Sequence, residues 1–258
     1  MDTLGAFLGL AIAAIIIYFT IGNNLELSLK TYQWLIIVGV IPAIVSVVLL
    51  VTLVHERKTA SPKEVASRQG IKLSNLLAGF DTRFKLFLAV IAVFTLGNPS
   101  NFFIILRAQD LGSPVLHVTL MLVLFNAIYA VISLPIGILS DKLGRRKIII
   151  LGWLIYALVY LGFALASSTW QIWLLFACFG VYYGITEGVA RAFVADMVPQ
   201  DKRGTAYGLY HGVLGIALLP ASLIAGWLWQ EINPATTFFY GAGLAFLATL
   251  GIIVLIKE

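Results

Sequence analysis

Charged residues are scarce in this 258-residue sequence. Asp, Glu, Lys and Arg make up 11% of it, whereas about a quarter of the residues of a soluble globular protein are charged. Hydrophobic residues make up 60%, and the mean hydropathy is +0.98. This composition excludes a water-soluble enzyme and a nucleic-acid-binding protein, and it indicates a protein that lies in a lipid bilayer.

Residues that form disulfides, hold metals or carry out catalysis are also few. Cys178 is the one cysteine, so no disulfide can form within the chain, and its place in an apolar run predicts a small buried side chain. The three histidines, His55, His117 and His211, are far apart in the sequence. No Gly-x-Ser-x-Gly motif and no glycine-rich phosphate-binding loop is present. The sequence therefore predicts no enzymatic activity, no cofactor and no bound metal.

Long uncharged apolar windows are abundant. A helix needs about 20 apolar residues to cross a hydrocarbon core about 30 Å thick, and eight suitable windows are present. Their hydrophobicity is continuous rather than alternating, which favours helices over barrel strands. We therefore predict an all-α, polytopic transmembrane helix bundle with spans at residues 3–22, 33–54, 86–106, 115–139, 148–166, 171–195, 205–229 and 235–256.

The basic residues are distributed unevenly between the loops. If the eight spans alternate in direction, fourteen of the seventeen Lys and Arg residues fall on one side. Lys30 and Arg107 fall on the other side, and Arg191 lies within the sixth span. Because Lys and Arg are concentrated in cytoplasmic loops, this distribution predicts a multi-pass protein of the cell (inner) membrane with both termini in the cytoplasm.

The segment between the fourth and fifth spans has the most specific local pattern. It reads Gly137-Ile-Leu-Ser-Asp-Lys-Leu-Gly-Arg-Arg-Lys147. Gly137 allows two helices to approach closely and Gly144 permits a tight reversal. Asp141 can pair with a cation at the membrane edge. The simpler alternative is a basic turn that only anchors the topology.

This segment resembles the inter-helix motif of the major facilitator superfamily, Gly-x-x-x-Asp-Arg-x-Gly-Arg-Arg/Lys, with Lys142 where arginine is usual. In that family the motif joins the second and third helices of each six-helix half, and the resemblance extends over essentially the whole chain. The positions that match the motif are Gly137, Asp141, Gly144, Arg145 and Arg146.

The resemblance implies a division of the chain into three parts. Residues 86–258 correspond to a complete C-terminal six-helix half, and residues 55–85 to the family's central cytoplasmic loop. Residues 1–54 correspond to the last two helices of the N-terminal half. Four helices of a whole transporter are then expected to be missing on the amino-terminal side, so that Met1 is either an internal methionine or a late start.

Glu187 and Arg191 are ionisable residues within the sixth span. A charged group at the bilayer centre costs about 2.5 to 3.5 kcal/mol on insertion scales. The two residues are four apart, so they share one helix face and can pair. The span matches the family's tenth helix, which usually lines the central cavity, so the resemblance places the pair in a substrate or proton pathway. A purely structural ion pair is the alternative.

Other polar residues within spans are candidates for the same pathway. Asn98 and Asn101 lie in the third span, which matches the family's seventh helix, another helix that lines the cavity. The further candidates are Asn126, Tyr183 and His211. Hydrogen bonds between helices are the alternative for Asn126 and His211, and simple packing is the alternative for Tyr183.

By the same resemblance, charged residues at the inner ends of spans form a cytoplasmic gate. Asp196 ends the sixth span and Arg203 begins the seventh. The resemblance implies that Asp141, Arg145 and Asp196 hold the inner gate closed in the outward-open state. A solvated turn is the alternative.

These observations together predict a secondary active transporter that moves a small solute by alternating access. Proton-coupled efflux of small hydrophobic or amphipathic compounds is the first interpretation, because the expected cavity is aromatic and mostly apolar. If Arg191 moved away, Glu187 could take up the coupling proton. Uptake of a small anion held by Arg191 is the second interpretation, and a truncated, non-transporting membrane scaffold is the third. The expected partners are the solute, the lipid bilayer and a proton.

Overall fold

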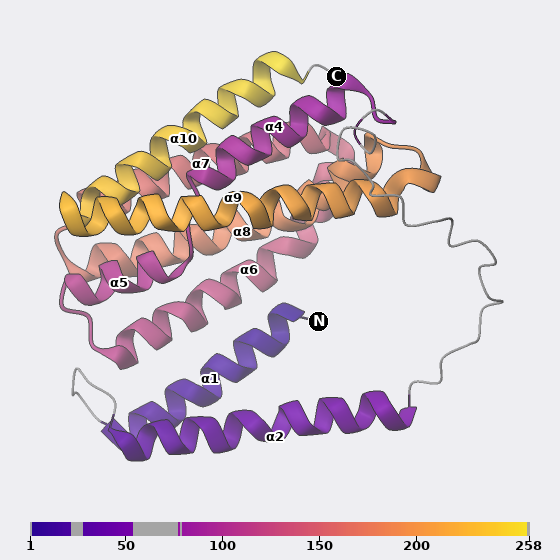
Figure 1. The fold of residues 1–258 in the computed structure, drawn as a ribbon. Helices are drawn as coiled ribbons and strands as arrows, with labels where there is room; N and C mark the ends of the chain where they lie inside the picture. The colour runs from indigo at the N-terminus through magenta and orange to yellow at the C-terminus, as the bar shows by residue number, and fades with distance from the viewer. Residues whose placement is uncertain (1, 22–27, 54–76, 78, 257–258) are drawn as a thin grey trace.

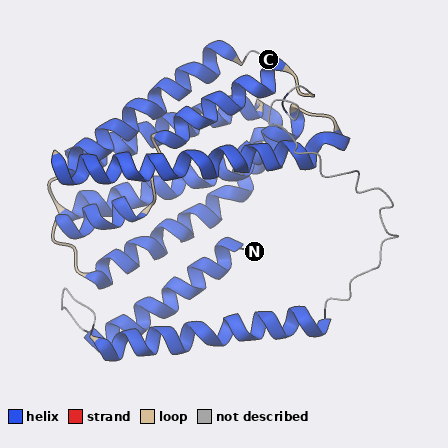
Figure 2. Cartoon of the chain, viewed as in Figure 1, coloured by secondary structure: helices blue, strands red, loops and turns tan. Residues whose placement is uncertain are grey.

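The computed structural model of the chain describes residues 2–21, 28–53, 77 and 79–256 (Figure 1). Every regular element within these ranges is helical (Figure 2). In chain order the elements are α1 (Asp2–Ile21), α2 (Leu29–Leu53), α4 (Thr82–Leu96), α5 (Phe102–Asp110), α6 (Val115–Leu143), α7 (Arg145–Leu165), α8 (Thr169–Asp196), the 3-10 helix η1 (Gln200–Lys202), α9 (Arg203–Glu231) and α10 (Pro234–Leu255). The predicted all-α fold class is confirmed.

The predicted spans coincide with helices. Within the described ranges, six segments are long and apolar enough to cross a membrane, namely α2, α6, α7, α8, α10 and η1 together with α9. Helix α1 contains a shorter apolar stretch, Leu4–Thr20. Most of the predicted central loop, residues 55–76, lies outside the described residues.

The third predicted span, residues 86–106, is not one continuous helix, which corrects the sequence-based prediction. Helix α4 ends at Leu96 and α5 begins at Phe102, and residues 97–101 between them are not helical. Pro99 lies in this gap. Proline has no N–H to donate, and it disfavours the helical conformation of the residue before it.

Proline alone does not decide where a helix breaks in this chain. Helices α6 and α9 continue through Pro135 and Pro220. At the break between α4 and α5, the Tyr156 hydroxyl of α7 donates to the Gly97 carbonyl oxygen at 2.9 Å. Gly97 also lies directly against α10, because a Cβ atom added to it would lie 2.9 Å from the Gly241 carbonyl oxygen. Contacts with α7 and α10 therefore support the break.

Helices α4 to α10 form one bundle, and α1 and α2 lie at its edge (Figure 1). Helix α8 packs against both α6 and α7, α10 packs against α7 and α4, and α9 packs against α4. Helix α1 packs along α6, and α2 contacts α1. The two ends of the described chain lie at the same end of the helices (Figure 1), as an even number of crossings requires.

Aromatic side chains form much of the core of the bundle, whereas helix α2 buries few of its side chains. Tyr156 and Tyr160 of α7 stack with their ring centroids 4.1 Å apart. Because lipid is as apolar as the side chains, close packing rather than removal from water stabilises such a core. On α2, by contrast, most aliphatic side chains are exposed. The largest fully buried side chains include Phe84, Phe87, Tyr156, Tyr160, Phe163, Phe176, Phe179 and Phe238.

Candidate functional site

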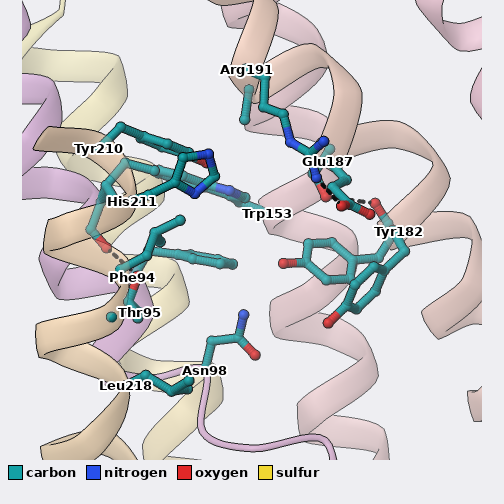
Figure 3. Close-up of a pocket in the computed structure, with 16 residues that line it drawn as sticks. Phe94, Thr95, Asn98, Trp153, Tyr182, Glu187, Arg191, Tyr210, His211 and Leu218 are labelled. Atoms are coloured by element: carbon teal, nitrogen blue, oxygen red, sulfur yellow. Dashed lines mark hydrogen bonds and ion pairs between the residues drawn. The ribbon is translucent and has the colours of Figure 1, made fainter. Parts of the chain in front are cut away.

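A cavity of about 330 Å³ lies between α4, α8 and α9 (Figure 3). Helix α7 contributes one side chain to its wall, that of Trp153. The break after α4 contributes Asn98. The other lining residues that the argument uses are Phe94, Tyr182, Tyr183, Glu187, Arg191, Tyr210 and His211.

Glu187 and Arg191 form an ion pair in the wall of this cavity. They lie one helical turn apart on α8, and the guanidinium of Arg191 donates to the carboxylate of Glu187. The exposed fraction of the side chain is 53% for Arg191 and 34% for Glu187. The predicted pair is therefore present, and it faces an open space rather than a sealed core.

Tyr129 is a third member of this group. Its hydroxyl, which comes from α6, donates to the second carboxylate oxygen of Glu187. The backbone of Arg191 is bonded to α9, because the Tyr207 hydroxyl donates to the Arg191 carbonyl oxygen at 3.2 Å. Sequence reasoning missed Tyr129, because nothing in the apolar sequence of α6 shows which residue faces Glu187.

Aromatic rings form much of the cavity wall. Phe94 of α4 and Trp153 of α7 stack with their ring centroids 4.4 Å apart. Tyr182 and Tyr210 also line the cavity, although most of each side chain is buried. These rings lie between the ion pair at one end of the cavity and Asn98 at the other (Figure 3).

The two asparagines of the third span lie at the break between α4 and α5. The side-chain oxygen of Asn98 accepts a hydrogen bond from the Tyr156 hydroxyl at 3.2 Å. The side-chain nitrogen of Asn101 donates to the Tyr183 hydroxyl of α8 at 2.9 Å. Both asparagines line a second hollow of about 350 Å³, which shares Asn98, Tyr183 and Leu218 with the first.

The remaining two pathway candidates have different positions. His211 of α9 lines the cavity and is exposed, and its ring meets that of Tyr210 edge-on at 5.1 Å. Asn126 is largely buried, and its side-chain nitrogen donates to the Leu122 carbonyl oxygen within α6 at 2.9 Å. Asn126 does not line the cavity, because its amide is used within its own helix.

Three of the predicted gate residues form a charge cluster at the C-terminal end of α8, beyond the Glu187–Arg191 pair. Arg145 lies 2.9 Å from Asp141 and 2.6 Å from Asp196. It also donates to the Ala192 carbonyl oxygen of α8 at 2.8 Å. The positive φ of +92° at Gly144 permits the tight reversal between α6 and α7. The cluster therefore joins the ends of α6, α7 and α8.

The other predicted gate residues lie outside this cluster. Arg146 donates to the Ile252 and Ile253 carbonyl oxygens, the latter at 2.8 Å, and so caps the C-terminal end of α10. The buried Nε of Arg203 has no hydrogen-bond partner among the described residues. A Cβ atom added to Gly137 would meet nothing within 4 Å, so the expected close helix approach is absent there. The role of these three residues in a gate therefore stays a prediction.

No group of three His, Cys, Asp or Glu side chains in the described part of the chain could hold a metal ion. The polar side chains of the cavity wall that the argument uses are the Glu187–Arg191 pair, the amide of Asn98 and the ring of His211.

Comparison with known proteins decides the family. The family model described as Major Facilitator Superfamily matches residues 85–258. An uncharacterized MFS-type transporter of Methanocaldococcus jannaschii is 37% identical over 255 residues, which cover 96% of this chain and 60% of the relative. The chain belongs to the major facilitator superfamily. Because members of this family are membrane transporters and not enzymes, membership confirms the predictions of a multi-pass membrane protein without enzymatic activity.

More distant relatives differ in what they transport. A multi-drug resistance efflux pump of Streptococcus pneumoniae is 31% identical over 134 residues, which cover 52% of this chain and 33% of the pump. A D-xylose transporter of Levilactobacillus brevis is 28% identical over 117 residues, which cover 41% of this chain and 26% of the transporter. Family membership therefore leaves the solute and the direction of transport open, and the chain spans 60% of the length of the archaeal relative.

Proposed function

We propose that this chain is part of a secondary active transporter that moves a small solute across the cell (inner) membrane by alternating access. The observation that carries the proposal is the Glu187–Arg191 ion pair, which lines an open cavity inside a helix bundle of this family. Charged groups are costly within a membrane. A pair kept beside an open cavity is therefore placed to meet a solute or a proton.

The proposed architecture follows the family pattern. Residues 86–258 form the C-terminal six-helix half, residues 55–85 the central loop, and residues 1–54 the last two helices of the N-terminal half. The family match from residue 85 onward and the packing of α1 along α6 support this division. With both termini in the cytoplasm, the Arg145 cluster lies at the inner end of the bundle, where it acts as the gate.

Proton-coupled efflux of amphipathic compounds is the proposed mode of transport. The aromatic wall offers an apolar surface to such a solute, and one relative is named as a multi-drug efflux pump. Glu187 is the proposed proton carrier. Tyr129 bonds to its second oxygen, so that the carboxyl group keeps a partner when Arg191 turns away.

Uptake of a small anion is the second candidate. The Arg191 side chain is 53% exposed and lines the cavity. A guanidinium group binds carboxylates and phosphates through parallel hydrogen bonds. An anion that enters the cavity would compete with Glu187 for this group.

Flux measurements in proteoliposomes test the proposal. The chain is reconstituted, a pH gradient is imposed, and transport of three fluorescent dyes is followed: ethidium as a cation, anilinonaphthalene sulfonate as an anion and Nile red as a neutral compound. We expect gradient-dependent flux of at least one dye. Glu187→Gln should reduce gradient-dependent flux to background. Glu231→Gln, which removes an exposed carboxylate at the far end of α9, should leave it unchanged.

The possible outcomes separate the candidate functions. Inward flux of the sulfonate alone would favour the anion carrier. Equal flux in the wild type and in Glu187→Gln would contradict proton coupling through Glu187. No flux of any dye would contradict transport by this chain and would favour the non-transporting scaffold.

A further inference from the structure

The charge of the cavity wall is balanced by two residues. Among the described lining residues, Glu187 and Arg191 are the carboxylate and the guanidinium, and they are paired with each other. Among the same described lining residues, His211 is the one histidine. With a neutral His211 ring, the cavity therefore offers one positive and one negative group and no net charge.

A solute with a single charge disturbs this balance. A cation that binds Glu187 displaces Arg191 and leaves the guanidinium without its carboxylate. An anion that binds Arg191 leaves Glu187 without its guanidinium, although Tyr129 still donates to it. A charge that loses its partner is less well stabilised than a paired one, so either solute loses part of what it gains by binding.

A solute that carries both charges keeps every charge paired. Its anionic group can bind Arg191 while its cationic group binds Glu187, so one ion pair is exchanged for two. The geometry suits this exchange, because both groups lie on one face of α8 and are one helical turn apart. The backbone of α8 need not move, since both partners belong to the same helix.

The rest of the cavity favours a flat, apolar body. Phe94 and Trp153 stack on each other, with an interplanar angle of 12°, and both line the cavity. Tyr182 and Tyr210 add further aromatic surface. The ring faces and edges that these side chains leave toward the cavity favour contact with another aromatic ring. In Figure 3 this surface lies directly beside the ion pair.

We propose that the solute of this cavity is a zwitterion built on a planar aromatic ring, whose anionic group pairs with Arg191 and whose cationic group pairs with Glu187. This inference rests on the proposed transport function, because it names the class of solute for the same cavity. It also explains why an acid and a base are placed together in the wall, where one charge would be enough to hold a proton or a simple ion.

A matched ligand series tests the charge requirement. The 258-residue chain is placed in lipid nanodiscs, and equilibrium binding is measured for four radiolabelled indoles at neutral pH. Tryptophan is the zwitterion, tryptamine the cation, indole-3-propionate the anion and 3-methylindole the neutral member. The ring is the same in all four, so differences report the charges. We expect tryptophan to bind at least tenfold more tightly than each of the others.

Charge-removing variants make the test specific to the ion pair. Glu187→Gln leaves an unpaired guanidinium and should shift the preference to indole-3-propionate. Arg191→Gln leaves an unpaired carboxylate and should shift it to tryptamine. Glu231→Gln and Lys147→Gln remove exposed charges outside the cavity and should preserve the wild-type order of affinities.

Several results would overturn the inference. These are tighter binding of a singly charged indole to the wild type, equal binding of all four within threefold, no saturable binding of any, or an order of affinities that the two cavity variants leave unchanged. The proposed transport function is judged separately by dye flux. Flux without a preference for the zwitterion refutes the inference alone, and a preference without flux refutes transport alone.

Discussion

Helix α8 carries two charge clusters that differ in how they are built. At the first cluster, Arg145 of α7 pairs with Asp141 of α6 and with Asp196 of α8. At the cavity, both charges of the ion pair, Glu187 and Arg191, belong to α8 itself. The first cluster therefore fastens three helices to one another, whereas the second leaves the charges of one helix beside an open space.

This difference assigns different physical tasks to similar side chains. A charge pair between helices opposes their separation, because the pair must break before the helices move apart. A pair within one helix can exchange its partner for a solute or a proton while the backbone stays in place. We therefore expect the Arg145 cluster to stabilise the fold and the cavity pair to govern binding. The following predictions test this contrast, from the largest effect to the smallest.

Arg145→Gln should destabilise the protein more than Arg191→Gln. It removes bonds to two carboxylates and to the Ala192 carbonyl oxygen, and it leaves both carboxylates without their guanidinium. Hydrogen bonds to charged groups contribute about 1.5 to 3 kcal/mol each, and partial exposure reduces this, so we expect a loss of about 2 kcal/mol. Thermal unfolding in detergent should show a Tm lower by about 6 °C. Equal losses in both variants would contradict the comparison.

Tyr129→Phe should have an intermediate effect on stability. Its hydroxyl supplies the bond between α6 and the cavity pair, and its loss should cost about 1 kcal/mol and lower Tm by about 3 °C. Tyr18→Phe, which alters an exposed side chain on α1, is the matched control and should leave Tm unchanged. A Tm unaffected by Tyr129→Phe would show that the cavity pair is not fastened to α6.

Asp141→Asn should have the smallest effect. The Asp141 side chain is 63% exposed, and exposed ion pairs contribute about 0 to 1 kcal/mol. Arg145 keeps Asp196 as its partner in this variant. A loss near the middle of this range should lower Tm by about 1 to 2 °C. A larger drop would show that the α6 side of the cluster, rather than the α8 side, holds it together.

Much of the fold is predictable from the sequence, and less of the site. The spans follow from long apolar runs, and the pairing of Glu187 with Arg191 follows from their spacing on one helix. The contact of Arg145 with Asp196 follows only from a family motif. The break at residues 97–101 requires knowledge of Tyr156 and Gly241, which lie far from it in the sequence. Pro99 lies in this region, but a proline alone does not predict a break, because α6 and α9 continue through theirs.

The sequence by itself determined which segments are apolar enough to cross a membrane, in what order, and which helix carries the charges of the cavity. These features are local, because lipid forces each span to satisfy its own backbone hydrogen bonds. Tertiary structure alone decided that Tyr129 meets Glu187, that Arg146 caps α10 and that Asn126 does not line the cavity. Such partners depend on the rotation and depth of neighbouring helices, and an apolar sequence leaves both unspecified.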